Sequence, residues 1–203
     1  MLSDQIETEI AALAARYGAP RRVEATLAGA PFDPLTMDDR YGEVCMVVRR
    51  TDGTLISARK TFYPAEAFRL LTGGVHHGEQ IAQALLREVA EETGLEVAVR
   101  RFLAVIEYAM PALAPRRFAT FAFLLDEIGG VLAVNDPAER IAGFRFLAPA
   151  ELPAQADALA RLPDHTDAEI GGSWRDWGRF RAIAHRVVYA ALHDAADRDH
   201  APA

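Results

Sequence analysis

The chain has 203 residues, 51% hydrophobic and 25% charged, which is typical of one globular domain with additions. The formal net charge is −7 and the sequence pI is about 5.4, and so acidic a surface disfavours DNA or general nucleic-acid binding. A single cysteine excludes an intrachain disulfide, no apolar run approaches the ~20 residues of a membrane span, and the N-terminus does not resemble a signal peptide, so a cytoplasmic protein without a membrane partner is expected.

The first predicted element is a helix over residues 3–17. Ser3 or Asp4 is suited to cap it, and its apolar residues recur at helical spacing. The stretch from Ala28 to Arg40 is rich in Pro, Gly and Asp and is expected to be a connector. Residues 1–40 are therefore predicted to be an N-terminal helix and connector.

Residues 41–152 are predicted to form the core, an α/β or α+β layered sheet. EVCMVVRRTDGTLISARK is typical of a β-hairpin, and FRLLTGG of a short strand that breaks at Gly73 and Gly74. LEVAVRRFLAVIEYA and RFATFAFLLDEI predict two longer strands, and FRFLAPAEL predicts a last strand leading into a helix. Residues 153–203 are expected to form a C-terminal helical extension packed on the core.

Three carboxylates mark one side of a helix predicted to begin near Glu79 and to end at Gly94. Glu88, Glu91 and Glu92 are spaced i, i+3 and i+4, so they project from the same side. Crowded carboxylates repel one another unless a cation lies among them. Mg²⁺ or Mn²⁺ is the natural counter-ion, because both prefer oxygen ligands.

The rest of this helix supports the same interpretation. An ion pair between Arg87 and Glu79 would hold the preceding loop against the helix, and the apolar stripe of Ile81, Leu85 and Val89 is expected to face the core. A glutamate-rich helix is most often a solvated surface. That alternative is disfavoured here, because residues 73–95 fit the pattern G-x5-E-x7-R-E-U-x-E-E-x-G-U at every position, with U a bulky aliphatic residue.

This pattern resembles the box of the Nudix hydrolases, and the order of strands over about residues 41–152 is similar to that family too. The resemblance implies an α/β/α sandwich on a mixed β-sheet, here with N- and C-terminal helical additions. It also implies hydrolysis of a nucleoside diphosphate linked to another group, with Mg²⁺ (or Mn²⁺) as cofactor.

The resemblance assigns roles to the residues of the box. By the family pattern, the metal ligands are Glu88, Glu91, Glu92 and the backbone carbonyl of Gly73. By the same pattern, Arg87 and Glu79 support the loop and helix structurally.

The resemblance further implies in-line attack of a water on one phosphorus, with a glutamate taking its proton. Glu91 and Glu92 are the candidates within the box. Outside it, Glu139 lies just before the last core strand, and Glu107, between the two long strands, is its rival.

The substrate branch is expected to be marked by residues after the box. Pro111 resembles the proline position of ADP-ribose pyrophosphatases, although Ala112 follows it where a glycine is usual. Arg116 and Arg117 are candidate phosphate ligands, with a solvated loop as the alternative. A small phosphorylated nucleotide-type substrate is expected, with ADP-ribose or a nucleotide sugar first.

Two alternatives remain open. A (deoxy)nucleoside triphosphate pyrophosphohydrolase of the sanitising type has the same box. A non-catalytic, nucleotide-binding regulatory Nudix domain belongs to another class, and it is disfavoured because such domains commonly lose box glutamates that this chain keeps.

Other residues carry weaker signals. Cys45 lies in the apolar run VCMVV and is expected to be a buried thiol, which argues against the related isopentenyl diphosphate isomerase and its catalytic cysteine. His76 and His77 are expected to be exposed loop residues. The tail helix is expected to pack on the domain, with a dimer contact or a pocket wall as alternatives and Trp174 as a candidate for stacking on a base. A homodimer is expected, since many family members dimerise through such additions.

Overall fold

The computed structural model describes residues 2–199 and the side chains of residues 2–194. The main elements, in chain order, are α1 (Asp4–Tyr17), β1 (Arg21–Thr26), β2 (Arg40–Arg49), β3 (Leu55–Lys60), β4 (Arg69–His76), α2 (Ile81–Thr93), β5 (Leu95–Ala109), β6 (Arg117–Gly130), β7 (Ile141–Leu147), α3 (Leu152–Ala160) and α4 (Trp174–Asp199).

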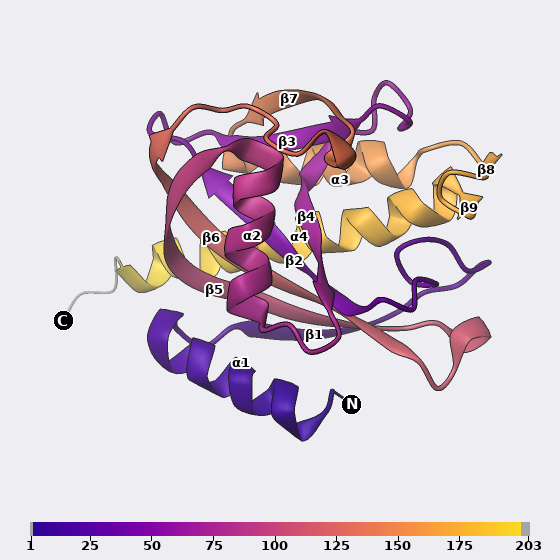
Figure 1. Cartoon of the computed structure of the whole chain (residues 1–203), viewed down its shortest axis with the longest axis horizontal. Helices are drawn as coiled ribbons and strands as arrows, with labels where there is room; N and C mark the ends of the chain where they lie inside the picture. Colours follow the sequence, from indigo (N-terminus) through magenta and orange to yellow (C-terminus); the bar gives the residue numbers. More distant parts are fainter. Residues whose placement is uncertain (1, 200–203) are drawn as a thin grey trace.

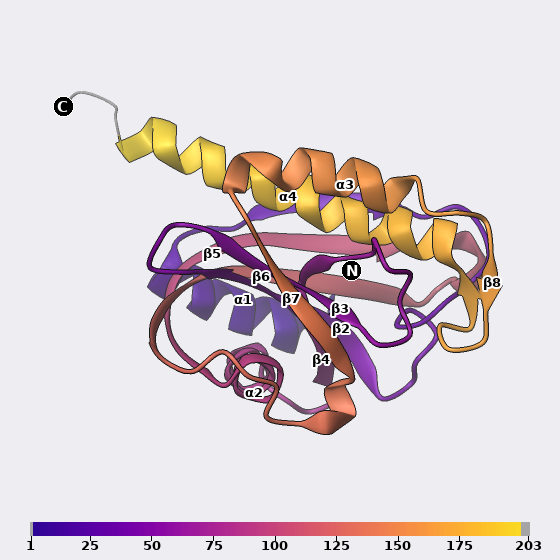
Figure 2. The ribbon, with the colours of Figure 1, turned by 90° about the horizontal axis from the view of Figure 1, so that it is seen from above.

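Seven of the strands form one mixed sheet in the order β1-β5-β6-β2-β4-β3-β7. The β1–β5 and β2–β6 pairs are parallel and the remaining pairs are antiparallel. Helices α1 and α2 cover one face, and α3 and α4 cover the other (Figures 1 and 2). The α/β sandwich on a mixed sheet that the sequence predicts is therefore confirmed.

The two faces of β2 explain its continuous apolar run. Val44 and Met46 pack in the cluster that includes the apolar stripe of α2, and Cys45 and Val47 pack in the cluster beneath α3 and α4. The Cys45 thiol is fully buried, as expected, and this burial raises its pKa to about 12. A central strand covered by helices on both faces needs apolar residues at every position rather than at alternate ones.

The N-terminal segment holds one strand that the sequence analysis missed. Helix α1 begins as predicted, with the Ser3 side chain accepting a hydrogen bond from the Ile6 backbone N–H. Strand β1 then pairs in parallel with β5 at one edge of the sheet, and most of its side chains are exposed or half-buried. An edge strand with two arginines and a glutamate carries little of the apolar alternation that identifies strands.

The predicted hairpin exists only at its tip. Strands β2 and β3 are joined at the single pair Arg49↔Leu55, because β4 lies between them along the rest of their length. The predicted break in β4 is also wrong. Gly73 and Gly74 pair with Val44 and Glu43 of β2, and the strand continues to His76.

The box helix is shorter than predicted at its start. It begins at Ile81 with Gln80 as its N-cap, and it ends at Thr93 before Gly94, whose φ of 63° is left-handed. Ile81 is fully buried, and the apolar stripe of α2 that it begins faces the core as expected.

Along most of its length, the edge of β4 that faces β3 has no paired strand. The pairs with β3 end at Leu70, and from this residue onward side chains bond the β4 backbone instead. His185 Nε2 accepts from the Leu70 N–H at 3.1 Å, Arg87 donates to the Gly74 carbonyl at 2.9 Å, and Glu79 accepts from the His76 N–H at 3.1 Å. The sheet therefore has a gap beside β4, and this gap is reached from both faces of the sheet.

Helix α4 packs as an integral part of the core. Trp177, Phe180 and Ala184 are buried in the cluster beneath α3 and α4. Trp174 is buried too: its Nε1 donates to Asp167, and its ring meets Trp177 edge-on. This ring therefore has no open face on which a base could stack. None of the described helices is long and apolar enough to cross a membrane.

Candidate functional site

A cavity of about 390 Å³ lies at the open edge of β4. Its walls come from β2, β4, α2, α4 and the short helix η2 (Pro137–Glu139), so it draws residues from both faces of the sheet. Gly73, Gly74 and Glu88 of the box line it, together with Glu139.

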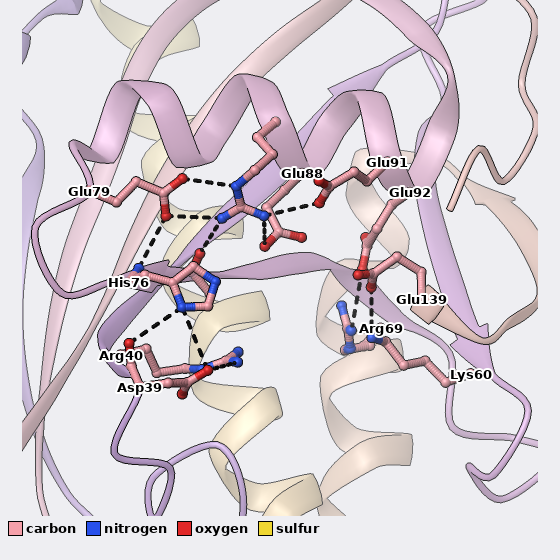
Figure 3. A network of polar contacts seen from close by, with 12 residues as sticks. Asp39, Arg40, Lys60, Arg69, His76, Glu79, Glu88, Glu91, Glu92 and Glu139 are labelled. Atoms are coloured by element: carbon pink, nitrogen blue, oxygen red, sulfur yellow. Dashed lines mark hydrogen bonds and ion pairs between the residues drawn. The ribbon is translucent and has the colours of Figure 1, made fainter. Parts of the chain in front are cut away.

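Three carboxylates converge at one end of this cavity. One oxygen each of Glu88, Glu92 and Glu139 lies within 4.8 Å of the other two (Figure 3). Helix α2 supplies the first two, one turn apart, and η2 supplies the third from the opposite wall. Glu139 also accepts a hydrogen bond from Lys60 Nζ at 2.9 Å.

Glu92 is the most constrained of the three. Its side chain is fully buried, and neither carboxylate oxygen has a hydrogen-bond partner. The nearest cation is the Arg69 guanidinium, whose Nη2 lies 3.9 Å from Oε1. Burial raises the pKa of the Glu92 carboxyl to about 8, although Arg69 acts in the opposite direction. A buried carboxylate without donors is costly, and a divalent cation coordinated by it would remove that cost.

These observations show that the residues present suit a divalent metal. Three carboxylates form a hard oxygen donor set of the kind that Mg²⁺ and Mn²⁺ prefer. Burial also raises the pKa of Glu88, with Arg87 opposing it, so this carboxylate too is held in an environment that favours a counter-ion.

Arg87 holds the loop, the helix and the carboxylates together. Its Nε and Nη2 donate to the two oxygens of Glu79 at 2.8 and 3.0 Å, and its Nη1 donates to Glu88 at 2.8 Å and Glu91 at 3.0 Å. Nη2 also donates to the Gly74 carbonyl. The Glu79–Arg87 ion pair expected from the sequence is therefore present, with further contacts that orient Glu88 (Figure 3).

Gly73 leaves room for the Glu88 side chain. A Cβ atom at this position would overlap with the Glu88 carboxylate. The glycine at the start of the box is thus required by the close approach of α2 to β4 rather than by a turn. Binding of a metal by the Gly73 carbonyl stays a prediction.

Glu91 and Glu107 are placed differently from the cluster. The Glu91 side chain is about one third exposed and bonds to Arg87, outside the group of three close carboxylates. Its roles as ligand or base stay predictions. Glu107 lies on β5 between Glu24 of β1 and Ala119 of β6 and does not line the cavity, so the geometry favours Glu139 over it as the glutamate outside the box.

The residues proposed for substrate binding do not line this cavity. Pro111 opens the short helix η1 (Pro111–Leu113) and, with Arg116 and Arg117, lines a separate depression. Arg116 donates to Asp38 at 2.7 Å and to the Met37 carbonyl, which fixes the segment before β2. The structure therefore gives Arg116 a local structural contact, and phosphate binding by it stays untested. His76, by contrast, lines the cavity.

Several cavity residues were missed by the sequence analysis. Among them are Glu43, Lys60, Arg69 and Arg181. A signal was available for two of them: Glu43 adjoins the buried run VCMVV, and Arg69 stands beside the apolar pair of a short core strand. A charged residue at such a position is buried, and a buried charge needs a specific partner.

Comparisons with known proteins find similar sequences over much of the chain. A family model described as the NUDIX domain matches residues 39–167. An ADP-ribose pyrophosphatase of Methanocaldococcus jannaschii is 35% identical over 94 residues, which make up 46% of this chain and 54% of that protein. An NAD-capped RNA hydrolase NudC of Pasteurella multocida is 30% identical over 125 residues, which make up 60% of this chain and 46% of that protein. The chain thus spans about half the length of these curated relatives.

A solved structure of a UDP-X diphosphatase is 20% identical, covers 81% of this chain and 66% of that one, and has a TM-score of 0.47. The matched residues 39–167 are more than half of the chain, and they contain the whole box and all three members of the carboxylate cluster. The chain belongs to the Nudix hydrolase family.

Proposed function

We propose that the chain is a pyrophosphohydrolase, dependent on Mg²⁺ or Mn²⁺, that cleaves the diphosphate of a nucleoside diphosphate linked to a sugar. The observation that carries this proposal is the convergence of Glu88, Glu92 and Glu139, with both oxygens of Glu92 buried and unbonded. A surface helix rich in glutamate would leave these oxygens to water.

The chain's own residues divide the work. Glu88 and Glu92 would hold the metal, and Arg87 keeps Glu88 turned toward it. The bound ion would neutralise charge on the phosphate oxygens and make the phosphorus more electrophilic. Glu139 faces these two carboxylates from the other wall. We assign it the role of general base, which takes the proton of the attacking water. Lys60, which donates to Glu139 Oε2, fixes the orientation of that carboxylate.

The charges in the cavity favour a substrate with a neutral group beyond the diphosphate. Every described lysine or arginine that lines it already pairs with a carboxylate: Arg40 with Asp39, Lys60 with Glu139, Arg69 with Glu92, Arg87 with Glu79, Arg140 with Glu169 and Arg181 with Glu43. A third phosphate would meet no uncommitted cation here. ADP-ribose or a nucleotide sugar therefore suits the cavity better than a nucleoside triphosphate, and the name of the Methanocaldococcus relative supports this class.

The test is identification of products by mass after incubation with Mg²⁺. The substrates are ADP-ribose, UDP-glucose, dinucleotides and (deoxy)nucleoside triphosphates, with Glu92→Gln as the inactive blank and Glu96→Gln, an exposed glutamate of β5, as matched control. AMP with ribose 5-phosphate supports the proposal. Nucleoside monophosphate with diphosphate supports the sanitising alternative, and ligand binding without Mg²⁺-dependent turnover supports a regulatory domain.

A further inference from the structure

The cavity has a second end on the other face of the sheet, away from the metal carboxylates. Glu43 of β2 and Arg181 and Trp177 of α4 line it there. Helix α4 lies outside the residues matched by the family model, so this wall is supplied by the chain's own C-terminal extension.

Glu43 and Arg181 form a buried pair with unused bonding capacity. Arg181 Nη1 donates to both oxygens of Glu43 at 2.8 Å, and Thr120 donates to Oε1 at 2.9 Å. Among the described residues, Oε2 of Glu43 accepts a bond only from Arg181. The Nε of Arg181 is closed off from the cavity, but its Nη2 is not fully buried and makes no hydrogen bond to the described residues. An orphaned donor thus stands beside a carboxylate with a free acceptor position.

We propose that Arg181 and Glu43 determine substrate specificity by binding neighbouring hydroxyl groups of a sugar joined to the diphosphate. One hydroxyl donates to Glu43 Oε2 and another accepts from Arg181 Nη2, which satisfies both vacant positions. The proposal rests on the proposed function, because the diphosphate at the glutamates brings the sugar into this end of the cavity.

Other ligand groups fit this end less well. A phosphate needs a cation whose charge is not already offset, and Glu43 offsets that of Arg181. A nucleobase needs an open aromatic face. The Trp177 ring is 1% exposed and is already contacted by Tyr63, Trp174 and the Arg181 guanidinium. A hydroxylated ring needs only the donor and acceptor that the pair provides.

The experiment measures binding of three non-hydrolysable probes to the full chain with Mg²⁺ by calorimetry. Methylenediphosphonate has no sugar, the α,β-methylene analogue of ADP has the nucleoside ribose, and the α,β-methylene analogue of ADP-ribose has a second ribose. The variants are Arg181→Lys, which keeps the charge but lacks the Nη2 donor, and the double change Glu43→Gln with Arg181→Gln, which removes both buried charges together. Arg186→Gln, an exposed arginine of the same helix paired with Asp157, is the control.

The expected result is a loss of affinity of about tenfold or more for a sugar-bearing probe, with methylenediphosphonate unchanged in both variants. Loss for the ADP-ribose analogue alone assigns the second ribose, and loss for both nucleotide analogues assigns the nucleoside ribose. Unchanged affinity for all three probes, or an equal loss for methylenediphosphonate, overturns the proposal. Failure of the native chain to cleave ADP-ribose while still binding its analogue would overturn the proposed function alone, and absence of any binding would overturn both.

Discussion

At the scale of single residues, the main feature of the site is a buried carboxylate that is unfavourable for folding by itself. Glu92 is fully buried without a hydrogen bond, beside an arginine too far away to donate one. Such a group lowers the stability of the metal-free protein, and a metal ion would recover that stability.

Glu92→Gln should therefore separate stability from function. In EDTA, the variant is expected to be as stable as the native chain or more stable, by up to about 1–3 kcal/mol, because Glu92 must bury its charge or take up a proton on folding and the amide need not. Mg²⁺ should raise the melting temperature of the native chain and of Glu96→Gln but not that of Glu92→Gln. Thermal unfolding with and without Mg²⁺ gives the answer. A variant that is less stable in EDTA yet still stabilised by Mg²⁺ would contradict the assignment.

Arg87→Lys tests the role of the guanidinium fork. Arg87 bonds at once to Glu79, Glu88, Glu91 and the Gly74 carbonyl, and a single ammonium cannot reach all of them. We expect the Mg²⁺ dissociation constant, measured by calorimetry, to rise about tenfold or more. Arg100→Lys, which alters an exposed pair with Asp126, should leave it unchanged. Equal metal affinity in the Arg87 variant and the native chain would show that Arg87 does not orient the ligands.

The box residues were predictable from the sequence because their relations are local. Residues one turn apart on a helix are neighbours whatever the rest of the chain does, so the spacing of Glu88 and Glu92 was sufficient. Arg181 and Glu43 are 138 residues apart and on different elements. Their contact depends on how α4 lies across the sheet, which no local pattern records.

At the scale of elements, one buried histidine links α4 to strand β4 of the sheet. His185 Nδ1 lies 2.8 Å from the Arg181 carbonyl and Nε2 accepts from the Leu70 N–H, so the ring must be neutral. Burial lowers the pKa of His185 to about 4; the hydrogen bond to the Arg181 carbonyl opposes this shift, and the positive charges of Arg181 and Arg69 add to it.

Because of this histidine, we expect the stability of the chain to depend on pH. The folded-state pKa lies below the ordinary value of about 6.5, so the unfolded chain binds a proton more readily in that range. The contribution of neutral His185 to the free energy of unfolding is complete above about pH 6.5 and is lost as the pH falls toward about 4. From pH 7 to pH 5, the free energy of unfolding in urea should fall by about 2 kcal/mol more in the native chain than in His185→Gln. Parallel profiles would show that the histidine is charged in the folded state.

Packing of α4 predicts a large cost for Phe180→Ala. The Phe180 ring is buried against Phe32, Tyr108 and Phe118, so its removal leaves a cavity in the core. We expect a loss of about 3–5 kcal/mol in urea unfolding. Arg179→Ala, at an exposed position of the same helix, should change stability by less than about 0.5 kcal/mol. A small effect of Phe180→Ala would show that α4 is an appendage rather than core.

Helices and strands were predictable from the sequence where the periodic pattern of apolar residues is strong. Helices α1, α2 and α4 were identified because their apolar residues recur at helical spacing. The β2–β3 hairpin was overestimated because an Asp-Gly turn specifies only that the chain reverses. Insertion of β4 between the two strands is a long-range pairing that a turn signal does not contain.

At the scale of the whole molecule, the sheet order explains why the site combines two faces. Strand β4 leaves β3 after Leu70, so α2 on one face and α4 on the other both reach the gap beside it. The metal carboxylates and the Glu43–Arg181 pair thus lie on opposite sides of one strand. The layered fold was predictable from the alternation of strands and helices, whereas this opening depends on the final strand order.

The side chains that finish the β4 edge have a consequence for solubility. An exposed strand edge offers unpaired backbone groups to which a strand of another molecule could add, and this is a common start of aggregation. Here His185, Arg87 and Glu79 occupy backbone groups of β4. The same residues that order the metal loop and attach α4 therefore also occupy positions to which such a strand would bond, and loss of Arg87 would leave the Gly74 carbonyl without its donor.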